Sequence, residues 1–293
     1  EKPITQENDP AAVRRLNQLT GPFILRRMKS EVLKELPPKT ENVYRIELEE
    51  EQRKLYLAAV VDAREKLRAA KPEDKMAVFA VLMRLREICC DPRLVADNWT
   101  GSSAKLEACL ELVTEAVAGG HRILLFSQFT SMLDLLAQRL DEAGVSHFTL
   151  QGSTPKPVRA ELVRRFNAGE ASVFLISLRA GGTGLNLTAA DIVIHYDPWW
   201  NVAAQNQATD RAYRIGQQNP VQVYKLIAQD TIEEKIVELQ QAKQPLADTV
   251  TGTADGAILS MRPDELLQLL VDVHAMVSVR PSMQYIHAAL QSL

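Results

Sequence analysis

Short apolar runs alternate with amphipathic stretches along the chain from about residue 120 onward. The runs carry few polar residues at alternate positions, which is typical of strands that are buried on both faces. Between the runs, apolar residues recur at helical spacing, and several of these stretches close at a glycine. We expect strands over residues 123–126, 147–150, 173–176, 192–196 and 221–227, and helices over 132–140, 158–166 and 207–217 and from 231 onward.

The repeated order of strand and helix predicts an α/β fold in which helices cover both faces of a parallel sheet. The pattern before residue 120 differs, because it predicts one strand and then three helices, at 43–47, about 51–68, 73–89 and 104–117. A further short helix is expected at 263–271. We therefore expect three parts: a joining segment over 1–40, an α/β lobe over 41–244 with a helical insertion at about 51–100, and a linker with a helical tail over 245–293.

Composition narrows the class of protein only a little. The chain of 293 residues is 46% hydrophobic and 24% charged, as in ordinary soluble globular proteins. With a net charge of −3, any contact with nucleic acid must come from local basic patches. The 3 cysteines have no metal-ligand spacing, no apolar run is as long as a membrane span, and no signal peptide opens the chain. Because the sequence begins with Glu1 rather than Met, we expect a fragment of a longer protein.

The most informative stretch is the run 207–217, Gln-Ala-Thr-Asp-Arg-Ala-Tyr-Arg-Ile-Gly-Gln. On a helix, its polar side chains would be three or four residues apart and share one face. These side chains are Gln207, Asp210, Arg211 and Arg214. Two guanidiniums held there could meet a terminal phosphate and neutralise the charge that develops during its transfer, as an arginine finger does. The run alone leaves a solvated surface helix as the alternative.

A glycine loop over residues 177–186 follows the expected strand 173–176. Ligands of open α/β sheets bind at the carboxyl ends of strands, and Gly182 and Gly184 would let backbone N–H groups approach phosphates closely. A dinucleotide-binding fingerprint is disfavoured, because its third small residue would fall at Leu187 and no full helix separates the loop from the next strand. For the glycines alone, a tight structural turn remains the alternative.

The chain lacks the parts that would hold a nucleotide. No Gly-Lys dipeptide occurs, so there is no Walker A loop to cradle phosphates. The run 141–144, Asp-Glu-Ala-Gly, has the composition of an acidic magnesium box, but it ends an amphipathic helix, where Gly144 is better explained as a C-cap. Candidate catalytic arginines without a nucleotide-holding loop would make sense if an ATPase were built from two lobes and only the second were present here.

Further motifs occur in order between about residues 21 and 244. They include Leu-Arg-Glu-Ile-Cys-Cys-Asp-Pro at 85–92 and Tyr-Asp-Pro-Trp-Trp-Asn at 196–201, and the others lie at 21–32, 36–39, 103–105, 124–129, 150–154, 177–195, 207–217 and 231–235. Each is a weak signal, but the ordered set resembles the Swi/Snf-type family of helicase-like ATPases, in a form that we associate with bacterial members. Ala104, Val202 and Tyr213 stand where the family usually has glycine, proline and histidine. Val202 and Tyr213 leave both arginines in place, so we expect them to tune activity.

The resemblance implies a RecA-like second lobe of a DNA-dependent ATPase that moves along duplex DNA without separating its strands. ATP with Mg²⁺ would be held mainly by an absent first lobe, and this chain would have no metal site. Arg211 and Arg214 would act as arginine fingers across the cleft. Gln207 and Asp210 would position them or contact the other lobe. Gly182 and Gly184 would shape a loop that couples the nucleotide state to the grip on DNA.

The resemblance also implies DNA contacts through hydroxyls, amides, cations and an indole, which suit a protein that follows the phosphate backbone rather than reading bases. The candidates are Lys105, Gln128, Ser153, Thr154, Ser177, Arg179 and Trp200. A solvated surface charge remains the alternative for Lys105 and Arg179. Packing beneath the loop remains the alternative for Trp200.

The expected partners are the first lobe of the same protein and duplex DNA, with a further protein partner for the C-terminal tail and no membrane. The expected location is the bacterial cytoplasm, or the nucleus for a eukaryotic member. Two other functions stay open: a lobe of a strand-separating DNA or RNA helicase, and an interaction module that kept the fold but lost catalysis. An unwinding assay on the full-length protein would decide the first, and the retained arginine pair argues against the second.

Overall fold

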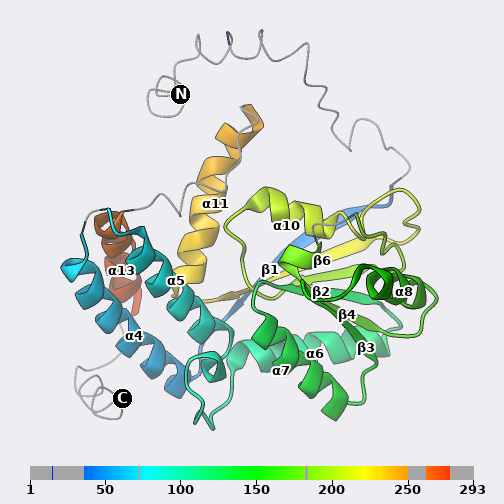
Figure 1. Ribbon diagram of the computed structural model, residues 1–293, viewed down its shortest axis with the longest axis horizontal. Helices are drawn as coiled ribbons and strands as arrows, with labels where there is room; N and C mark the ends of the chain where they lie inside the picture. Colours follow the sequence, from blue (N-terminus) through cyan, green and yellow to red (C-terminus); the bar gives the residue numbers. More distant parts are fainter. Residues whose placement is uncertain (1–14, 16–35, 72, 182–183, 250–261, 278–293) are drawn as a thin grey trace.

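The computed structural model describes residue 15 and residues 36–71, 73–181, 184–249 and 262–277. Within these ranges a 6-stranded sheet has the order β1-β6-β5-β2-β4-β3, and all neighbouring strands are parallel (Figure 1). The predicted parallel sheet is therefore confirmed. The strands are β1 (Lys39–Ile46), β2 (Ile123–Ser127), β3 (His147–Leu150), β4 (Val173–Ser177), β5 (Ile192–His195) and β6 (Val221–Ala228).

Helices cover both faces of this sheet, as the apolar runs predict. Ile123 and Leu125 of β2 belong to one apolar core, which they share with α6 and α7. Leu124 and Phe126 belong to the core of the opposite face, which includes residues of α8 and α10. Because successive strand residues point to opposite faces, one continuous apolar run supplies both cores. The helices on the two faces are α6 (Ala104–Ala118), α7 (Thr130–Glu142), α8 (Lys156–Asn167), α9 (Leu178–Gly181) and α10 (Val202–Thr209).

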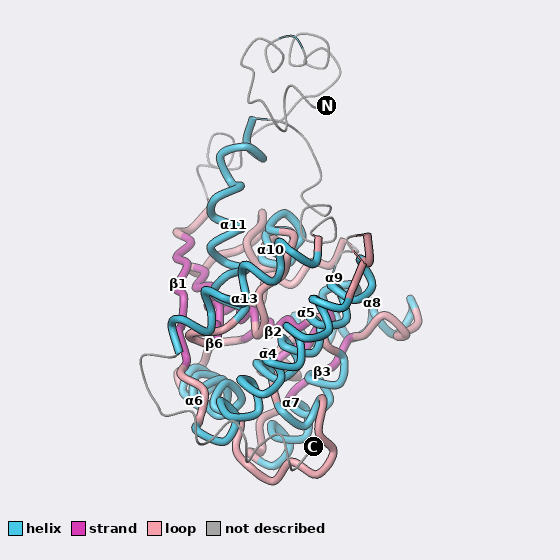
Figure 2. Tube along the Cα trace, turned by 90° about the vertical axis from the view of Figure 1, so that its left-hand side faces the viewer, coloured by secondary structure: helices cyan, strands magenta, loops and turns pink. Residues whose placement is uncertain are grey.

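A second group of helices, which we call the helical addition, stands beside the sheet (Figures 1 and 2). One face of α4 is apolar, because Tyr56, Val60, Ala63 and Leu67 recur at three- or four-residue spacing and are buried. They form a separate core with side chains of the other helices of the addition. The elements of the addition are α4 (Glu50–Ala69), α5 (Lys75–Cys90), the short 3₁₀ turn η1 (Pro92–Leu94), α11 (Ile232–Thr249) and α13 (Pro263–Val277).

Two of these helices are longer than their sequence patterns predict. α11 runs through Pro245 to Thr249, although a proline lacks the N–H that the helix needs and favours an end before it. Its first half is anchored in the core of the helical addition by Ile236. α13 continues to Val277 instead of ending near residue 271. Most of the expected joining segment, residues 250–261 of the linker and residues 278–293 of the tail lie outside the described residues.

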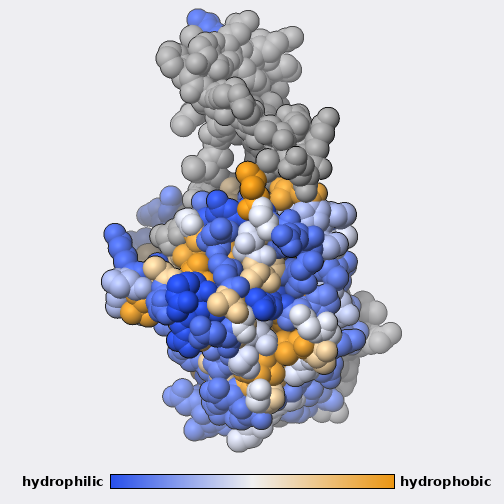
Figure 3. Space-filling model, turned by 90° about the vertical axis from the view of Figure 1, so that its right-hand side faces the viewer, coloured by the Kyte–Doolittle hydropathy of each residue, from blue (hydrophilic) through white to orange (hydrophobic). Residues whose placement is uncertain are grey.

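The surface on the right-hand side of Figure 1 carries small apolar patches separated by hydrophilic side chains (Figure 3). Met76 and Ile215 have the most exposed large apolar side chains in the described part of the chain, and they lie far apart in the sequence. In that part, no helix combines the length and the apolar character that crossing a membrane requires.

Candidate functional site

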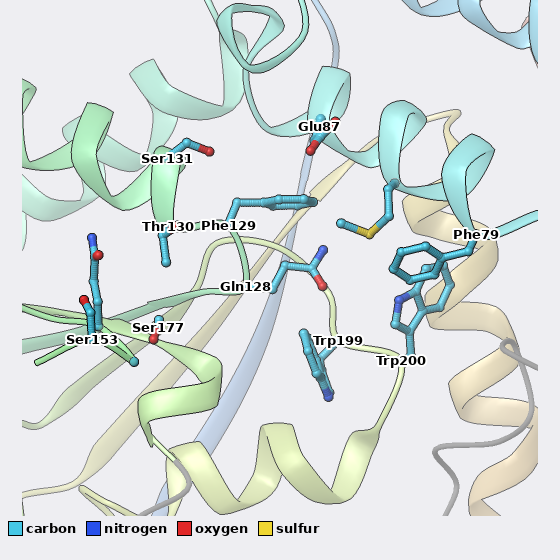
Figure 4. Close-up of a pocket in the computed structure, with 13 residues that line it drawn as sticks. Phe79, Glu87, Gln128, Phe129, Thr130, Ser131, Ser153, Ser177, Trp199 and Trp200 are labelled. Carbon is cyan, nitrogen blue, oxygen red and sulfur yellow. The ribbon is translucent and has the colours of Figure 1, made fainter. Parts of the chain in front are cut away.

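A groove of about 780 Å³ opens where the carboxyl ends of β2, β3 and β4 face helix α5 (Figure 4). Parallel strands end at the same edge of their sheet, so residues distant in the sequence meet there. The groove brings together four of the seven residues that the resemblance implies as DNA contacts. These four are Gln128, Ser153, Ser177 and Trp200.

The strand ends supply the polar part of the groove. Ser177 is the last residue of β4, and its Oγ accepts the N–H of Ala180 (3.4 Å) as the chain enters α9. Ser153 belongs to the turn after β3, in which the N–H of Thr154 donates to the carbonyl oxygen of Gln151 (3.1 Å). The groove lining also includes Thr130, Ser131, Gln151 and Gly152. This part offers hydroxyl and amide groups that can donate to phosphate oxygens.

Arg159 of α8 holds the turn 151–154 through hydrogen bonds to its backbone carbonyl groups. Its Nε donates to the carbonyl oxygen of Thr154 (2.8 Å), and its Nη2 donates to that of Gly152 (2.8 Å). With these carbonyl groups bound to the guanidinium, the turn has a defined shape. Sequence reasoning did not single out Arg159, because a cation on an amphipathic helix reads as a solvated surface residue.

A buried carboxylate, Asp197, joins the ends of β2 and β5 beneath the groove. Its Oδ1 accepts hydrogen bonds from Ser127 Oγ (2.6 Å) and from the N–H of Gln128 (3.2 Å). Its Oδ2 lies 3.3 Å from Nη2 of Arg86, and both side chains are wholly buried. Burial raises the pKa of Asp197, and the charge of Arg86 opposes that rise. The carboxylate thereby fixes the loop that presents Gln128.

The part of the groove nearest to α5 is aromatic. Phe79 and Trp200 lie at this end, and Ser153 and Ser177 lie at the other (Figure 4). The ring centroid of Trp200 is 4.6 Å from the guanidinium carbon of Arg86, which is a cation–π contact. Trp200 therefore packs beneath the loop as its alternative interpretation predicts, and it also lines the groove. Burial raises the pKa of Glu87, the acidic residue of this lining.

The interpretation of Lys105 as a DNA contact is wrong. Its side chain is wholly buried and is paired with the equally buried carboxylate of Glu233. Burial acts to lower the pKa of Lys105, but the charge and hydrogen bond of Glu233, together with the neighbouring Cys90 and Cys89, outweigh this effect and the pKa is raised. The ammonium also lies 5.6 Å from the ring centroid of Tyr196. An ammonium held inside the protein in this way has no route to a phosphate, and it is not a solvated surface charge either.

The two remaining DNA candidates lie away from the groove or are not described. The hydroxyl oxygen of Thr154 accepts the N–H of Gln151 (3.1 Å), and Thr154 does not belong to the groove lining. Its hydroxyl therefore shapes the turn that presents Ser153. Arg179 has its backbone in α9, and its side chain lies outside the described residues.

The helix expected over 207–217 ends early, at Thr209. The next N–H groups donate three residues back, from Arg211 to Ala208 and from Ala212 to Thr209 (both 3.1 Å), which tightens the chain into turns. The carbonyl oxygen of Arg211 accepts the N–H of Leu187 (3.0 Å) instead of a later helical N–H. Both candidate arginines therefore lie on turns, and the single helical face predicted for them is wrong.

The turns nevertheless place Arg211 and Arg214 together beside the glycine loop. Nη1 of Arg214 donates to the carbonyl oxygen of Leu185 (3.3 Å). Burial lowers the pKa of Arg211, the neighbouring charge of Arg214 adds to this effect, and Asp210 opposes it. Arg211 is 7% exposed, while Arg214 is only partly buried.

The other predicted cleft residues differ in how fully they are described. Gln207 is exposed on α10, and Asp210 directly follows that helix. Gly184 is exposed and has a φ of 50°, a backbone conformation that favours glycine. Gly182 lies outside the described residues. Among the described residues, no group of three or more His, Cys, Asp or Glu side chains is placed to hold a metal ion.

Two family models match the chain, the helicase conserved C-terminal domain over residues 104–216 and the SNF2-related domain over residues 1–94. A putative ATP-dependent helicase/translocase of Bacillus subtilis is 40% identical over 276 residues, which are 91% of this chain and 30% of that protein. The C-terminal domain of the SWI2/SNF2 ATPase of Sulfolobus solfataricus has a TM-score of 0.65 at 28% identity, over 78% of this chain and 96% of that one. The chain belongs to the Swi/Snf-type family.

The ATPase core of the same archaeal protein, solved in complex with double-stranded DNA, matches 92% of this Swi/Snf-type chain. Its TM-score is 0.68 at 30% identity, and the chain covers 57% of that core. These matches confirm the RecA-like fold of the second lobe. The chain spans less than a third of the bacterial relative and just over half of the archaeal core.

The departures from the Swi/Snf-type pattern have simple structural settings. Val202 is the first residue of α10, directly after its N-cap Asn201, whose side chain accepts the N–H of Ala204 (3.1 Å). A proline is favoured at this helical position, so the valine keeps the same local structure. Tyr213 packs at the edge of the core on the α8 face, and Lys39 lies 5.8 Å from its ring centroid.

Proposed function

We propose that this chain is the second motor lobe of a DNA-dependent ATPase that moves along double-stranded DNA. The observation that carries the proposal is the arginine pair beside the glycine loop. Arg211 and Arg214 come from adjacent turns, lie close enough for their charges to interact, and both hold the loop 184–187 through hydrogen bonds. That loop follows α9, which leaves the carboxyl end of β4.

In this proposal ATP and its Mg²⁺ bind between this lobe and a first lobe. The first lobe supplies the Walker A loop with its lysine and the carboxylates that hold Mg²⁺. The guanidinium of Arg214 approaches the terminal phosphate from this side and stabilises the negative charge that develops during phosphoryl transfer. Arg211 is more deeply buried and shares this charge. The guanidinium of Arg214 binds the carbonyl oxygen of Leu185 in the glycine loop, and the main-chain carbonyl of Arg211 accepts the N–H of Leu187 just after it. A shift of Arg214 with the bound nucleotide would therefore move that loop.

We assign the groove to the DNA backbone. Its polar end offers Ser153 and Ser177, Gln128 lies between the two ends, and none of the described residues that line it is a lysine or an arginine. Hydroxyl and amide donors suit a protein that must hold each phosphate briefly and release it, without regard to sequence. The archaeal ATPase core solved with double-stranded DNA supports duplex DNA as the partner.

The first test is ATP turnover by this chain alone and by the parent protein, each with and without duplex DNA. We expect no DNA-stimulated turnover from the isolated chain and clear stimulation in the parent protein. Robust DNA-stimulated turnover by the isolated chain would contradict the two-lobe proposal, because one lobe would then suffice to hold and hydrolyse ATP.

A strand-separating helicase is the second candidate, since the Bacillus relative carries both words in its name, helicase and translocase. An unwinding assay on the parent protein separates the two. A translocase without strand separation releases no labelled strand from a duplex while it hydrolyses ATP. Release at a rate comparable with ATP turnover would favour the helicase.

A further inference from the structure

Side chains from the helical addition and from the end of the sheet hold the segment 197–200, which we call the Trp200 loop. From α5, Nη2 of Arg86 donates to the carbonyl oxygen of Pro198 (2.5 Å) and lies 3.3 Å from the Asp197 carboxylate. From α11, Nε2 of Gln240 donates to the carbonyl oxygen of Trp199. From the sheet, Ser127 Oγ donates to Asp197 (2.6 Å). The loop is therefore fixed between the helical addition and the end of β2.

Arg86 contacts both groups that shape the groove. Its guanidinium carbon is 4.6 Å from the ring centroid of Trp200 and 5.6 Å from that of Phe129. Through Asp197 it is linked to the N–H of Gln128, which donates to the same carboxylate (3.2 Å). The buried guanidinium of Arg86 therefore contacts the aromatic end of the groove directly. Through Asp197 it is also linked to the loop that carries Gln128.

Core packing alone does not account for this arginine. Its Nε and Nη1 have no hydrogen-bond partner among the described residues, although the side chain is wholly buried. Buried donors without partners destabilise a fold, and an apolar side chain of similar volume often serves stability as well or better. A buried guanidinium is useful where several groups must be held in one geometry, because it is planar, charged and able to stack on an indole.

We infer that Arg86 is a positioning residue that pre-forms the DNA groove by fixing the Trp200 loop and, through Asp197, the Gln128 loop. The inference rests on the proposed function, because it concerns the same groove. It also makes the helical addition part of the DNA site, since a shift of α5 relative to the sheet would move Arg86 and with it both loops.

The test uses the parent protein with Arg86→Met, Arg86→Lys and Gln240→Met. Arg84→Met is the matched control, because Arg84 lies on the same helix and lines a separate small groove between α4 and α5. ATP turnover is measured against the concentration of duplex DNA, which separates the half-saturating DNA concentration from turnover at saturation. In a second set, this chain alone carries the same substitutions together with Trp99→Phe and Trp199→Phe, which leave Trp200 as its one tryptophan, and the emission of Trp200 is recorded without DNA.

We expect Arg86→Met to raise the half-saturating DNA concentration about tenfold while turnover at saturating DNA changes less than about threefold. Arg86→Lys should still raise the half-saturating DNA concentration about threefold. The ammonium of lysine can make one of the hydrogen bonds of the guanidinium, but it cannot lie flat on the indole. Gln240→Met should have an effect of about the same size, since it removes one of the two side chains by which the helical addition holds the loop. The emission of Trp200 should change with Arg86→Met and stay the same with Arg84→Met.

A half-saturating DNA concentration that is the same for Arg86→Met and Arg84→Met would overturn the inference. A loss confined to turnover at saturating DNA would also overturn it. If Arg86→Met does not fold, Arg86→Lys and Gln240→Met decide by the same criteria. If DNA does not stimulate the parent protein at all, the proposed function fails, and the emission of Trp200 still tests the link: unchanged emission in Arg86→Lys and Arg86→Met would refute it.

Discussion

Lys105 offers a sharp test, because the sequence motif and the structure make opposite predictions for it. In the structure its ammonium and the carboxylate of Glu233 form a wholly buried ion pair between α6 and α11. Lys105→Met removes the cation and leaves the carboxylate buried. Oε2 of Glu233 would keep the N–H of Ala228 (2.8 Å), while its Oε1 already has no partner among the described residues.

Breaking a buried pair in this way costs about 3–5 kcal/mol, because the remaining charge is uncompensated. Lys66→Met is the matched control, since Lys66 pairs with Asp62 (2.8 Å) at the surface and its side chain is 60% exposed. A surface pair contributes about 0–1 kcal/mol. The double variant Lys105→Met, Glu233→Gln removes both charges but keeps an acceptor for Ala228. It should recover about 1–2 kcal/mol relative to Lys105→Met.

The measurement is urea unfolding of this chain, followed by circular dichroism and fluorescence, with binding of duplex DNA measured in parallel. Coincident transitions and an unchanged m-value establish that the free energies of unfolding are comparable. The reasoning would be refuted if Lys105→Met lowered the free energy of unfolding no more than Lys66→Met does and also markedly lowered DNA affinity. Lys105 would then belong to the DNA surface.

The remaining predictions concern pH and the groove. Burial lowers the pKa of His195 to about 3, so the folded state keeps it neutral while the unfolded chain takes up a proton below about pH 6.5. Stability contributed by His195 is therefore complete above that pH and falls as pH drops, by about 1.4 kcal/mol per pH unit down to about pH 3. His195→Gln should lack this slope in urea unfolding at pH 4–6; equal slopes would contradict the assignment. Ser153→Asp places a negative charge in the groove and should weaken duplex binding by the parent protein about tenfold. Ser146→Asp, at the opposite end of β3, should change it less than about twofold, and similar losses would remove the groove from the DNA site.

The sequence predicts the sheet well because its signal is local. The strand over 147–150 has the predicted boundaries, since Gly144 (φ 67°) ends the turn before it and the next turn follows at once. The carboxyl ends of parallel strands must meet, so the groove could be expected from strand order and motif positions. Gln128, Ser153 and Ser177, which the resemblance implies as DNA contacts, line this groove.

The errors arise where contacts between distant residues decide the outcome. The helix after Asn201 stops at Thr209 because the carbonyl oxygen of Arg211 binds Leu187, a contact that helical periodicity does not contain. Lys105 is 128 residues from Glu233, and Arg86 is 111 residues from Asp197. A spacing rule that covers one helical turn cannot detect such pairs, although Arg86 and Asp197 both fall within motifs that the sequence marks.

The central claim, that this lobe donates cations to a phosphate held by its partner lobe, is tested most directly by Arg214→Ala in the parent protein. Arg164→Ala is the control, because Arg164 pairs with Glu161 on the exposed face of α8. ATP turnover at saturating ATP and duplex DNA is measured together with DNA affinity. The account predicts that Arg214→Ala lowers turnover about 10³-fold or more and leaves DNA affinity within about threefold, while Arg164→Ala changes neither. A loss of turnover below about tenfold would contradict it and remove Arg214 from the mechanism.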